Sequence, residues 1–298
     1  MGLKITKASD SIPVDHIVVN IYGGPGLGKT SLGFTAEKAL LLDFDGGAYR
    51  SGNRGDVVRV ESWPEVSRIG ADDLAGYQTV VVDTVGRALD HLTATIVEDD
   101  PKLARRDGSL SLQGFGALKA SFASWLTRLK QCGLDVVLIA HMDEQKKGDE
   151  IIERLDVQGS SKNEIHKSGD AMGRLYMQNG KRVLNFSPSD VGFGKNPAGF
   201  EPLAVPDFSK EPQFLAGIVS KIKAKLNEES EEQSRSRVAL AEAREAFSQL
   251  ELPEQFDSEA ERLKKADPKV KRLLVEVAAE KGYEFDGKAK AFRVREAA

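Results

Sequence analysis

The chain has 298 residues, of which 40% are hydrophobic, and a formal net charge of −4 at pH 7. That length accommodates one large α/β domain with an appendage, or two modest domains, and the hydrophobic content is sufficient for a packed core. The single cysteine, Cys132, excludes a disulfide framework within one chain and any cysteine-rich zinc site. No apolar stretch approaches the roughly 20 residues that span a bilayer, and no signal peptide opens the sequence. We therefore expect a soluble, intracellular protein with no membrane partner.

After a short polar arm at residues 1–15, an apolar, β-branched strand at 16–22 leads into a glycine-rich loop. The loop is a complete Walker A sequence, made of Gly23, Gly24, Pro25, Gly26, Leu27, Gly28, Lys29 and Thr30 and followed by Ser31. Its glycines allow the backbone to wrap around a phosphate, and the helix that follows directs free N–H groups at the anion. We expect Lys29 to reach the β- and γ-phosphates and Thr30 to ligand Mg²⁺. The chain is therefore predicted to bind a nucleoside triphosphate.

Strands that are apolar on both faces alternate with helices along the first half of the chain. The pattern predicts helices at 28–39, 86–98 and 114–131, and strands at 39–44, 57–60, 79–84 and 134–141. This alternation is typical of an α/β fold, with a mostly parallel sheet and helices on both sides. In such a sheet a ligand binds at the carboxyl ends of the strands.

Three of these strands end in side chains suited to nucleotide hydrolysis. Asp83 is predicted to be the Walker B carboxylate, which holds Mg²⁺ through water. Asp43 and Asp45 follow the second strand, where a carboxylate can orient or deprotonate the attacking water. Alternation along the strand sends both to the same side, so the sequence does not choose between them. His141 stands where a γ-phosphate sensor would lie, because histidine can donate to a phosphate oxygen. A solvated turn and a packed histidine are the structural alternatives.

Beyond His141 the sequence becomes more polar and its elements shorter. An Asn-Gly turn at 179–180 predicts a hairpin of strands 174–178 and 182–186. Residues 187–212 are expected to be irregular, and a helix at 214–226 is expected to lead into a charged connector. Pro253 and Pro268 separate three short helices in the remainder. This organisation gives an N-terminal arm at 1–15, an ATPase core at 16–212, a helix and charged connector at 213–237, and a C-terminal helical region at 238–298.

The motifs Gly-Gly-Pro-Gly-Leu-Gly-Lys-Thr, Asp-Phe-Asp-Gly-Gly, Val-Val-Val-Asp-Thr and Leu-Ile-Ala-His, in this order, resemble those of RecA-fold ATPases. More narrowly, residues 109–129 and the strand, loop and hairpin pattern at 134–200 resemble phage-encoded ATP-binding recombinases of the Sak single-strand annealing type. The resemblance covers residues 14–210. It implies a RecA-like P-loop core that oligomerises on single-stranded DNA and hydrolyses ATP with Mg²⁺, in the cytoplasm of a bacterium or a phage-infected host.

The resemblance also implies roles for particular residues. Lys29 and Thr30 bind phosphate and Mg²⁺, and Asp83 supports the metal. Asp45 falls where the relatives carry a catalytic glutamate, and His141 takes the position that couples the γ-phosphate to a DNA-binding loop. Because aspartate is one methylene shorter than glutamate, this departure bears on the hydrolysis rate more than on ATP binding. The Phe-x-x-Ala polymerisation motif of related recombinases is absent from the sequence, so a ring or filament requires other contacts.

Basic side chains in two expected loops are candidates for DNA contact. The loop at 142–168 contains Lys146, Lys147, Lys162 and Lys167, and the loop after the Walker B helix contains Lys102, Arg105 and Arg106. Such clusters neutralise backbone phosphates and make binding salt-dependent, although a solvated charged loop has the same composition. ATPases of this fold often receive a cation from the neighbouring subunit, and Lys195 and Arg174 are the candidates for that role.

Our leading hypothesis is an ATP-dependent recombination protein that binds single-stranded DNA and promotes annealing or strand pairing, with ATP hydrolysed at the subunit interfaces of a homo-oligomer. The alternatives are a RecA-fold helicase motor and a nucleotide-gated protein-binding module with little turnover. The sequence lacks an Asn-Lys-x-Asp guanine-reading motif, which favours ATP over GTP. The acidic connector and helical tail are a docking site for a single-strand-binding protein or a solvated helical cap.

Overall fold

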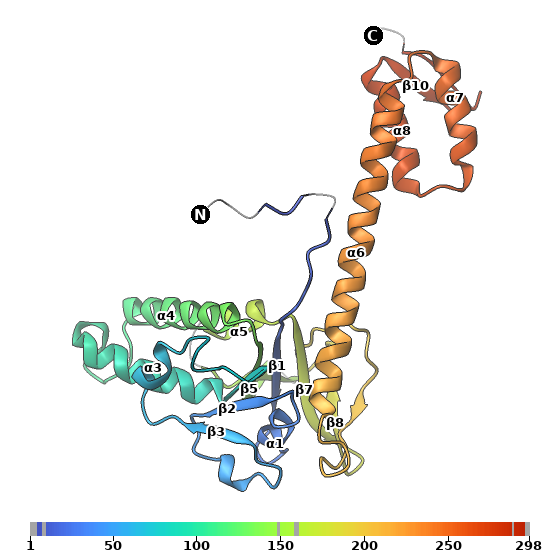
Figure 1. The fold of residues 1–298 in the computed structure, drawn as a ribbon. Coiled ribbons are helices and arrows are strands. Elements are labelled where there is room, and N and C mark those ends of the chain that lie inside the picture. Colours follow the sequence, from blue (N-terminus) through green and yellow to red (C-terminus); the bar gives the residue numbers. More distant parts are fainter. Residues whose placement is uncertain (1–4, 8–9, 148–149, 158–160, 288, 296–298) are drawn as a thin grey trace. The chain divides into compact units, whose positions relative to one another are not determined.

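The computed structural model describes residues 5–7, 10–147, 150–157, 161–287 and 289–295 (Figure 1). The chain divides into two compact units. The larger consists of Val14–Leu226, and the smaller of Met1–Pro13 together with Asn227–Ala298. None of the described helices combines the length and the apolar character that a membrane span requires.

A mostly parallel sheet forms the centre of the larger unit. Its strands are β1 (Val18–Gly23), β2 (Ala39–Asp43), β3 (Asp56–Arg59), β4 (Thr79–Asp83), β5 (Asp135–Lys147), β7 (Ala171–Gln178), β8 (Lys181–Asn185) and β9 (Leu203–Ala204). They lie in the order β3-β2-β4-β5-β1-β7-β8-β9, in which β7–β8 and β8–β9 are antiparallel pairs and all other pairs are parallel. A further strand, β6 (Glu150–Leu155), pairs antiparallel with the second half of β5. A single strand, β5, separates β1 from β4. The expected fold class, a RecA-like P-loop NTPase core with a mostly parallel sheet, is confirmed.

Helices cover both faces of this sheet (Figure 1). They are α1 (Lys29–Gly33), η1 (Ala48–Arg50), α2 (Trp63–Ser67), α3 (Val85–Asp99), η2 (Pro101–Leu103), α4 (Leu112–Gln131), α5 (Ser161–Ser168) and the first turns of α6 (Phe214–Ser248). Successive strand residues point to opposite faces, and the core is accordingly split into two layers. Leu42 and Val82 belong to the layer packed against α2, α3 and α4, whereas Leu41 and Val81 belong to the layer packed against α1 and α6.

Aromatic side chains dominate the layer beneath α4. The ring centroids of Trp63 and Trp125 lie 5.0 Å apart, and those of Phe122 and Trp125 lie 5.9 Å apart. The buried Trp125 indole would lose a hydrogen bond to water, but its Nε1 donates to the carbonyl oxygen of Val66 at 2.8 Å. Both tryptophans of the chain therefore report on this one layer.

Helix α1 is much shorter than the helix predicted at 28–39, and it ends at Gly33. Thr35 accounts for the early end. Its Oγ1 donates to the Leu32 carbonyl oxygen at 2.7 Å and accepts from the Leu215 amide at 3.1 Å, while its own carbonyl accepts from the Ala216 amide at 3.0 Å. Hydrogen bonds between Thr35 and α6 thus take the place of the next turn of α1. Helix propensity cannot predict this end, because the partners of Thr35 are distant in the sequence.

The sequence predicted that a helix at 214–226 would give way to a charged connector, but α6 runs without a break from Phe214 to Ser248. The run Glu228–Glu232 contains no glycine or proline, and glutamate is a good helix former, so the helix simply continues. Within the larger unit, Leu215, Ile218 and Ile222 are buried against the sheet. Lys223 Nζ also pairs with Asp135 Oδ2 at 2.7 Å.

The smaller unit has a core of its own. After α6 come α7 (Pro253–Arg262), η3 (Leu263–Lys265) and α8 (Pro268–Glu280), with prolines at the first turns as the sequence predicts. The helix that the sequence predicts after Pro268 is α8, but it ends at Glu280. The antiparallel hairpin of β10 (Tyr283–Asp286) and β11 (Ala291–Val294) that follows it was not predicted from the sequence. The core of this unit contains Phe247, Phe256, Leu274, Val277 and Phe292.

Replacing Phe122 by alanine should destabilise the larger unit by about 3–5 kcal/mol, because it removes a fully buried ring and leaves a cavity beside Trp125. Urea unfolding followed by tryptophan fluorescence measures this change. Leu112→Ala on the same helix is the matched control: Leu112 is 85% exposed, so its loss should change the free energy of unfolding by less than about 0.5 kcal/mol. Equal effects of the two substitutions would contradict the packing described here.

Candidate nucleotide-binding site

Strand β1 enters the phosphate loop at Gly23, between β5 and β7. A Cβ atom at Gly23 would overlap the carbonyl oxygen of Leu175 on β7. Gly26 and Gly28 have φ angles of 74° and 80°, which residues with side chains rarely adopt. Helix α1 then begins at Lys29 with Gly28 as its N-cap. The path of the loop therefore requires these glycines, and the strand–loop–helix arrangement is the one that a Walker A sequence predicts.

Lys29 lies at the bottom of the loop and is 6% exposed. Its Nζ donates to the carbonyl oxygens of Gly23 at 2.9 Å and Gly24 at 2.8 Å. Burial lowers the pKa of Lys29, and the carboxylates of Asp83 and Asp45 oppose this shift. An ammonium group held by loop carbonyls can exchange them for phosphate oxygens, which are stronger acceptors because they are charged.

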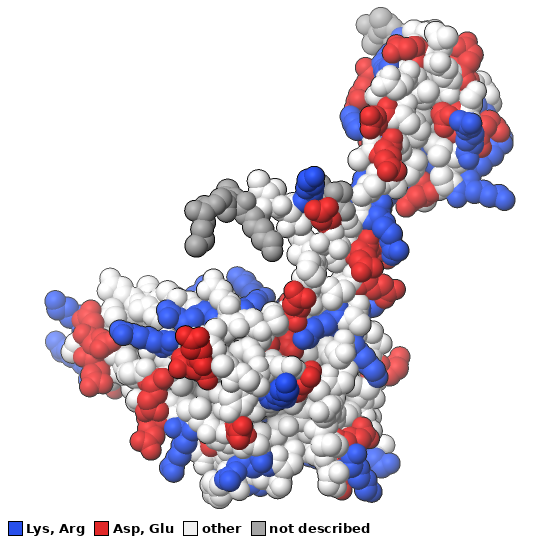
Figure 2. All heavy atoms as spheres, in the orientation of Figure 1, with Lys and Arg blue, Asp and Glu red and all other residues white. Residues whose placement is uncertain are grey.

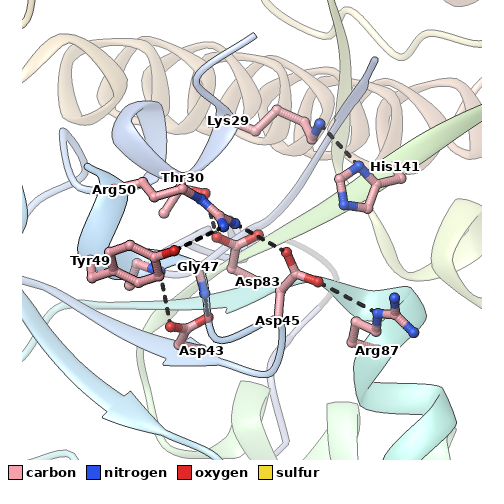
Figure 3. A network of polar contacts seen from close by, with 11 residues as sticks. Lys29, Thr30, Asp43, Asp45, Gly47, Tyr49, Arg50, Asp83, Arg87 and His141 are labelled. Atoms are coloured by element: carbon pink, nitrogen blue, oxygen red, sulfur yellow. Dashed lines mark hydrogen bonds and ion pairs between the residues drawn. The ribbon is translucent and has the colours of Figure 1, made fainter. Parts of the chain in front are cut away.

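Asp83 ends β4 beside the loop and is 4% exposed. Its Oδ2 accepts a hydrogen bond from Thr30 Oγ1 at 2.6 Å (Figure 3). Burial raises the pKa of Asp83 to about 6, and the negative charges of Asp43 and Asp45 act in the same direction. The Thr30 hydrogen bond and the Lys29 charge oppose this shift. The peptide bond that follows, Asp83–Thr84, is cis.

The pair formed by Thr30 and Asp83 fits a magnesium ion. A buried carboxylate crowded by other carboxylates is stabilised by a cation, and carboxylate and hydroxyl oxygens suit Mg²⁺. Among the described residues no group of three His, Cys, Asp or Glu side chains forms a metal site. Phosphate and water oxygens would therefore complete the coordination. When bound, the ion supplies positive charge to the phosphate oxygens.

The structure distinguishes the two acids that follow β2. Asp43 is buried, and its two carboxylate oxygens accept from the amides of Gly47 at 3.1 Å and Ala48 at 3.0 Å. It therefore holds the turn that begins η1. The Asp45 side chain is 29% exposed and lies on the pocket side of that turn (Figure 3). Of the two, Asp45 is the carboxylate available to a water molecule near a bound phosphate.

His141 occupies the matching position on β5, paired in register with Gly23. Its Nδ1 lies 3.4 Å from Lys29 Nζ, and because an ammonium group has no lone pair, Nδ1 is the acceptor. Burial lowers the pKa of His141, with the charge of Lys29 acting in the same direction. The neutral imidazole can therefore respond to any change in the position of Lys29.

Four polar residues of the site were not predicted from the sequence. Ser51 Oγ lies 2.7 Å from Ser31 Oγ, and Asn53 Nδ2 donates to the Ser31 carbonyl at 2.9 Å. Arg50 and Arg87 flank Asp45 on its two sides, with Arg50 Nη2 3.8 Å and Arg87 Nε 3.5 Å from its carboxylate oxygens. Gly46 and Gly47 indicate a tight turn in the sequence. They do not indicate in which direction the side chains of that turn point.

These residues surround a single pocket of about 270 Å³ at the carboxyl edge of the sheet. Its lining consists of Gly26, Gly28, Lys29, Thr30, Ser31, Asp45, Gly47, Arg50, Ser51, Asp83, Thr84 and His141. The pocket is polar and partly open, and it combines cationic groups with oxygen ligands for a metal. This combination suits the phosphate chain of a nucleotide.

None of the described candidates for DNA contact lines this pocket. Lys102 lies on η2, Arg105 and Arg106 lie in the loop before α4, and Lys167 lies near the end of α5; all four are exposed. The side chains of Lys146, Lys147 and Lys162 lie outside the described residues. On the face drawn in Figure 2, Lys and Arg side chains lie among Asp and Glu side chains rather than in one continuous basic surface.

The two candidates for a cation donated to a neighbouring subunit are both held within their own chain. Lys195 Nζ donates to the carbonyl oxygens of His166 and Gly169, each at 2.7 Å. Arg174 forms a bidentate ion pair with Glu153. Either residue would have to give up these contacts to act on another subunit.

The family match found by comparison with known proteins covers the part of the chain that contains the pocket. Residues 15–198 match the family described as AAA domain, a stretch that contains every side chain of the pocket. The chain belongs to the AAA domain family. Its members are P-loop ATPases, and membership implies that this AAA domain binds a nucleotide, typically with Mg²⁺.

Individual relatives are distant. The chain is 28% identical over 141 residues to the SPbeta prophage-derived uncharacterized protein YorG of Bacillus subtilis (strain 168), which is 44% of this chain and 42% of that protein. The chain thus spans less than half of this curated relative. Among solved structures, the RadB recombinase matches with 15% identity and a TM-score of 0.35, over 56% of this chain and 79% of that one. An ATPase from a bacterial type III secretion system matches with 14% identity and a TM-score of 0.36, over 54% and 52%.

Asp83→Asn should stabilise the Mg²⁺-free AAA domain at pH 7.5 by on the order of 2 kcal/mol, because it removes a charge whose burial raises the pKa of Asp83 to about 6. Asp83 binds a proton more tightly in the folded chain than in the unfolded chain. The free energy of unfolding of the unsubstituted chain should therefore fall as the pH rises from about 4 to about 6 and then level off. Urea unfolding at a series of pH values that extends up to the pH of the first prediction measures both effects.

The same substitution should abolish the additional stability that Mg²⁺ with ATP confers, because Asn offers no anionic ligand. Asp72→Asn is the control, since Asp72 is exposed and lies outside the pocket, and it should change neither quantity. A less stable Asp83→Asn chain that still responds to Mg²⁺ would disprove the role given to this carboxylate.

Proposed function

We propose that this chain is an ATPase that binds single-stranded DNA and promotes annealing or strand pairing in recombination. The observation that carries the proposal is the position of His141, which contacts the phosphate-binding lysine and also stands at the base of a long β-hairpin. Because the hairpin begins at the nucleotide site, ATP binding can change the position of a surface outside the pocket.

The connection runs through both strands of the hairpin. β5 leaves the parallel sheet after His141 and continues to Lys147, where the sequence suggested only a polar loop. It pairs there with β6, beginning with Met142 opposite Leu155. The amide of Asp156, just past β6, donates back to the His141 carbonyl at 3.0 Å. A shift of Lys29 toward a γ-phosphate would alter its contact with His141 and thereby the base of the hairpin.

In this proposal, hydrolysis of ATP depends on five side chains at or beside the pocket. Lys29 binds β- and γ-phosphate oxygens, and Thr30 and Asp83 provide the magnesium ligands. Asp45 orients the attacking water and accepts its proton. Asp43 acts only by holding the turn that carries Asp45.

DNA contact is assigned to the basic residues that flank this route. Lys146 and Lys147 belong to the hairpin sequence, and Lys167 lies at the end of α5, which packs beside α4 and β1. Arg105 and Arg106 extend the set along the loop before α4. Contacts of this kind with a phosphate backbone weaken as the salt concentration rises, because the counterions that binding releases then gain less entropy. The prophage origin of a relative agrees with a recombination role in phage DNA metabolism.

The first test is phosphate release from ATP with and without single-stranded DNA. We expect clear stimulation by DNA at about 50 mM salt and its loss at several hundred millimolar. Lys29→Ala should reduce turnover at least about 100-fold in both conditions, because it removes a charge from the transferring phosphate. Turnover that DNA does not change, together with tight ATP-dependent binding of a protein, would instead select the nucleotide-gated module.

His141→Ala should separate hydrolysis from DNA. We expect ATP affinity within about threefold of the unsubstituted chain, because Lys29 retains its two carbonyl partners, but DNA stimulation should fall about tenfold or more. His16→Ala is the matched control, since His16 is exposed and lies at the opposite end of β1. Stimulation that survives in His141→Ala would refute the coupling route.

A further inference from the structure

Arg50 is the described guanidinium group that lines the nucleotide pocket. It is the last residue of η1, and its side chain points toward Asp45 (Figure 3). Arg50 Nη2 lies 3.8 Å from Asp45 Oδ2, and the Arg50 side chain is 62% exposed. An ion pair at this distance and exposure contributes little stability. The pairing with Asp45 is therefore easily exchanged for a stronger anion.

The turn that carries Arg50 is shaped to place it there. Gly46 has a φ angle of 65°, and the Asp43 carboxylate holds the next two amides. A Cβ atom on Gly47 would meet the Arg50 guanidinium, so the Arg50 side chain folds back over the turn that carries Asp45. The Tyr49 ring also contacts the guanidinium: its centroid lies 5.2 Å from Arg50 Cζ, and Arg50 Nη1 donates a long hydrogen bond of 3.5 Å to the Tyr49 hydroxyl.

Other cations near the loop are differently placed. Arg87 also contacts Asp45, but it lies outside the pocket lining, and its Nη1 pairs with Asp90 at 3.2 Å. Arg182 lies beside Gly28, donates to the Pro206 carbonyl at 3.2 Å and lies over the Phe208 ring. Of these, only Arg50 combines a place in the lining with a weak partner that a nucleotide can replace.

We propose that Arg50 binds the terminal phosphate of a nucleoside triphosphate in the same chain, taking the place that a cation from a neighbouring subunit often fills. The proposal rests on the proposed ATPase function and names a further residue of that site. A terminal phosphate offers two charged oxygens to the planar guanidinium, and a paired arrangement of this kind is stronger than the contact at 3.8 Å.

The exchange has a second effect on the carboxylate that Arg50 leaves. Asp45 Oδ2 loses its partner, while Oδ1 remains beside Arg87 Nε at 3.5 Å. One carboxylate oxygen is then positioned by Arg87 and the other is available to the attacking water. Binding of the triphosphate and release of the base are thus a single event, and a diphosphate, which lacks the terminal group, does not cause it.

A comparison of ATP and ADP affinities tests the proposal without relying on turnover. Arg50→Ala should weaken ATP binding about tenfold and ADP binding less than about twofold, because the guanidinium contacts only the terminal phosphate. Arg87→Ala, the matched control on the same carboxylate, should leave the ratio of the two affinities as it is. Equal losses for ATP and ADP, or no loss for either, would overturn the assignment.

Turnover provides the second readout. Arg50→Ala should lower kcat about 100-fold or more, because it removes a charge from the transferring phosphate. Arg87→Ala should lower kcat less than about tenfold, because Arg87 contacts Asp45 and not the phosphate. Arg50→Lys should recover part of the loss, because it restores the charge without the planar fork. Turnover per chain should stay constant on dilution over about two decades, since one chain holds the complete set of charges. Turnover that vanishes on dilution would show that the cation comes from another chain. An unsubstituted chain that releases no phosphate contradicts the ATPase proposal itself, and the affinity ratio then still decides the assignment of Arg50.

Discussion

The parallel register of four neighbouring strands is the constraint on which the site depends. Gly23 at the end of β1 lies opposite His141 on β5, and Asp43 at the end of β2 lies opposite Asp83 on β4. Because parallel strands end at one edge, a phosphate loop, a metal-binding acid, a turn that carries a base and a histidine come together there without long excursions of the chain. A one-residue slip of any of these strands would turn the functional side chain to the other face.

Charge is concentrated at that edge at a cost to the fold. Burial alone disfavours the charged forms of both Lys29 and Asp83, and each is supported by the opposite charge of the other. A site that leaves its groups partly uncompensated keeps them available to a ligand that brings both phosphates and a cation. The hydrogen bond from Thr30 to Asp83 holds two of these groups in position meanwhile.

The phosphate loop, the alternating strands and the acids at their ends could be predicted from the sequence because these features are local. Hydrophobic runs determine strands, and the glycines of the loop leave few conformations. Arg50 and Arg87 could not be found in this way, since their relation to Asp45 depends on the direction of a turn and on how α3 leaves β4. The short α1 was missed for a similar reason: Thr35 bonds to residues of α6 that are distant in the sequence.

The first turns of α6 have a consequence for how this protein can be divided. The region that matches the family ends at residue 198, yet one face of the central sheet is covered by Leu215, Ile218 and Ile222. Thr35 and Asp135 bind this same helix segment. The smallest fragment that can fold as the nucleotide-binding unit therefore extends to the neighbourhood of Leu226, and a fragment cut at the limit of sequence similarity would present an apolar sheet face to water and aggregate.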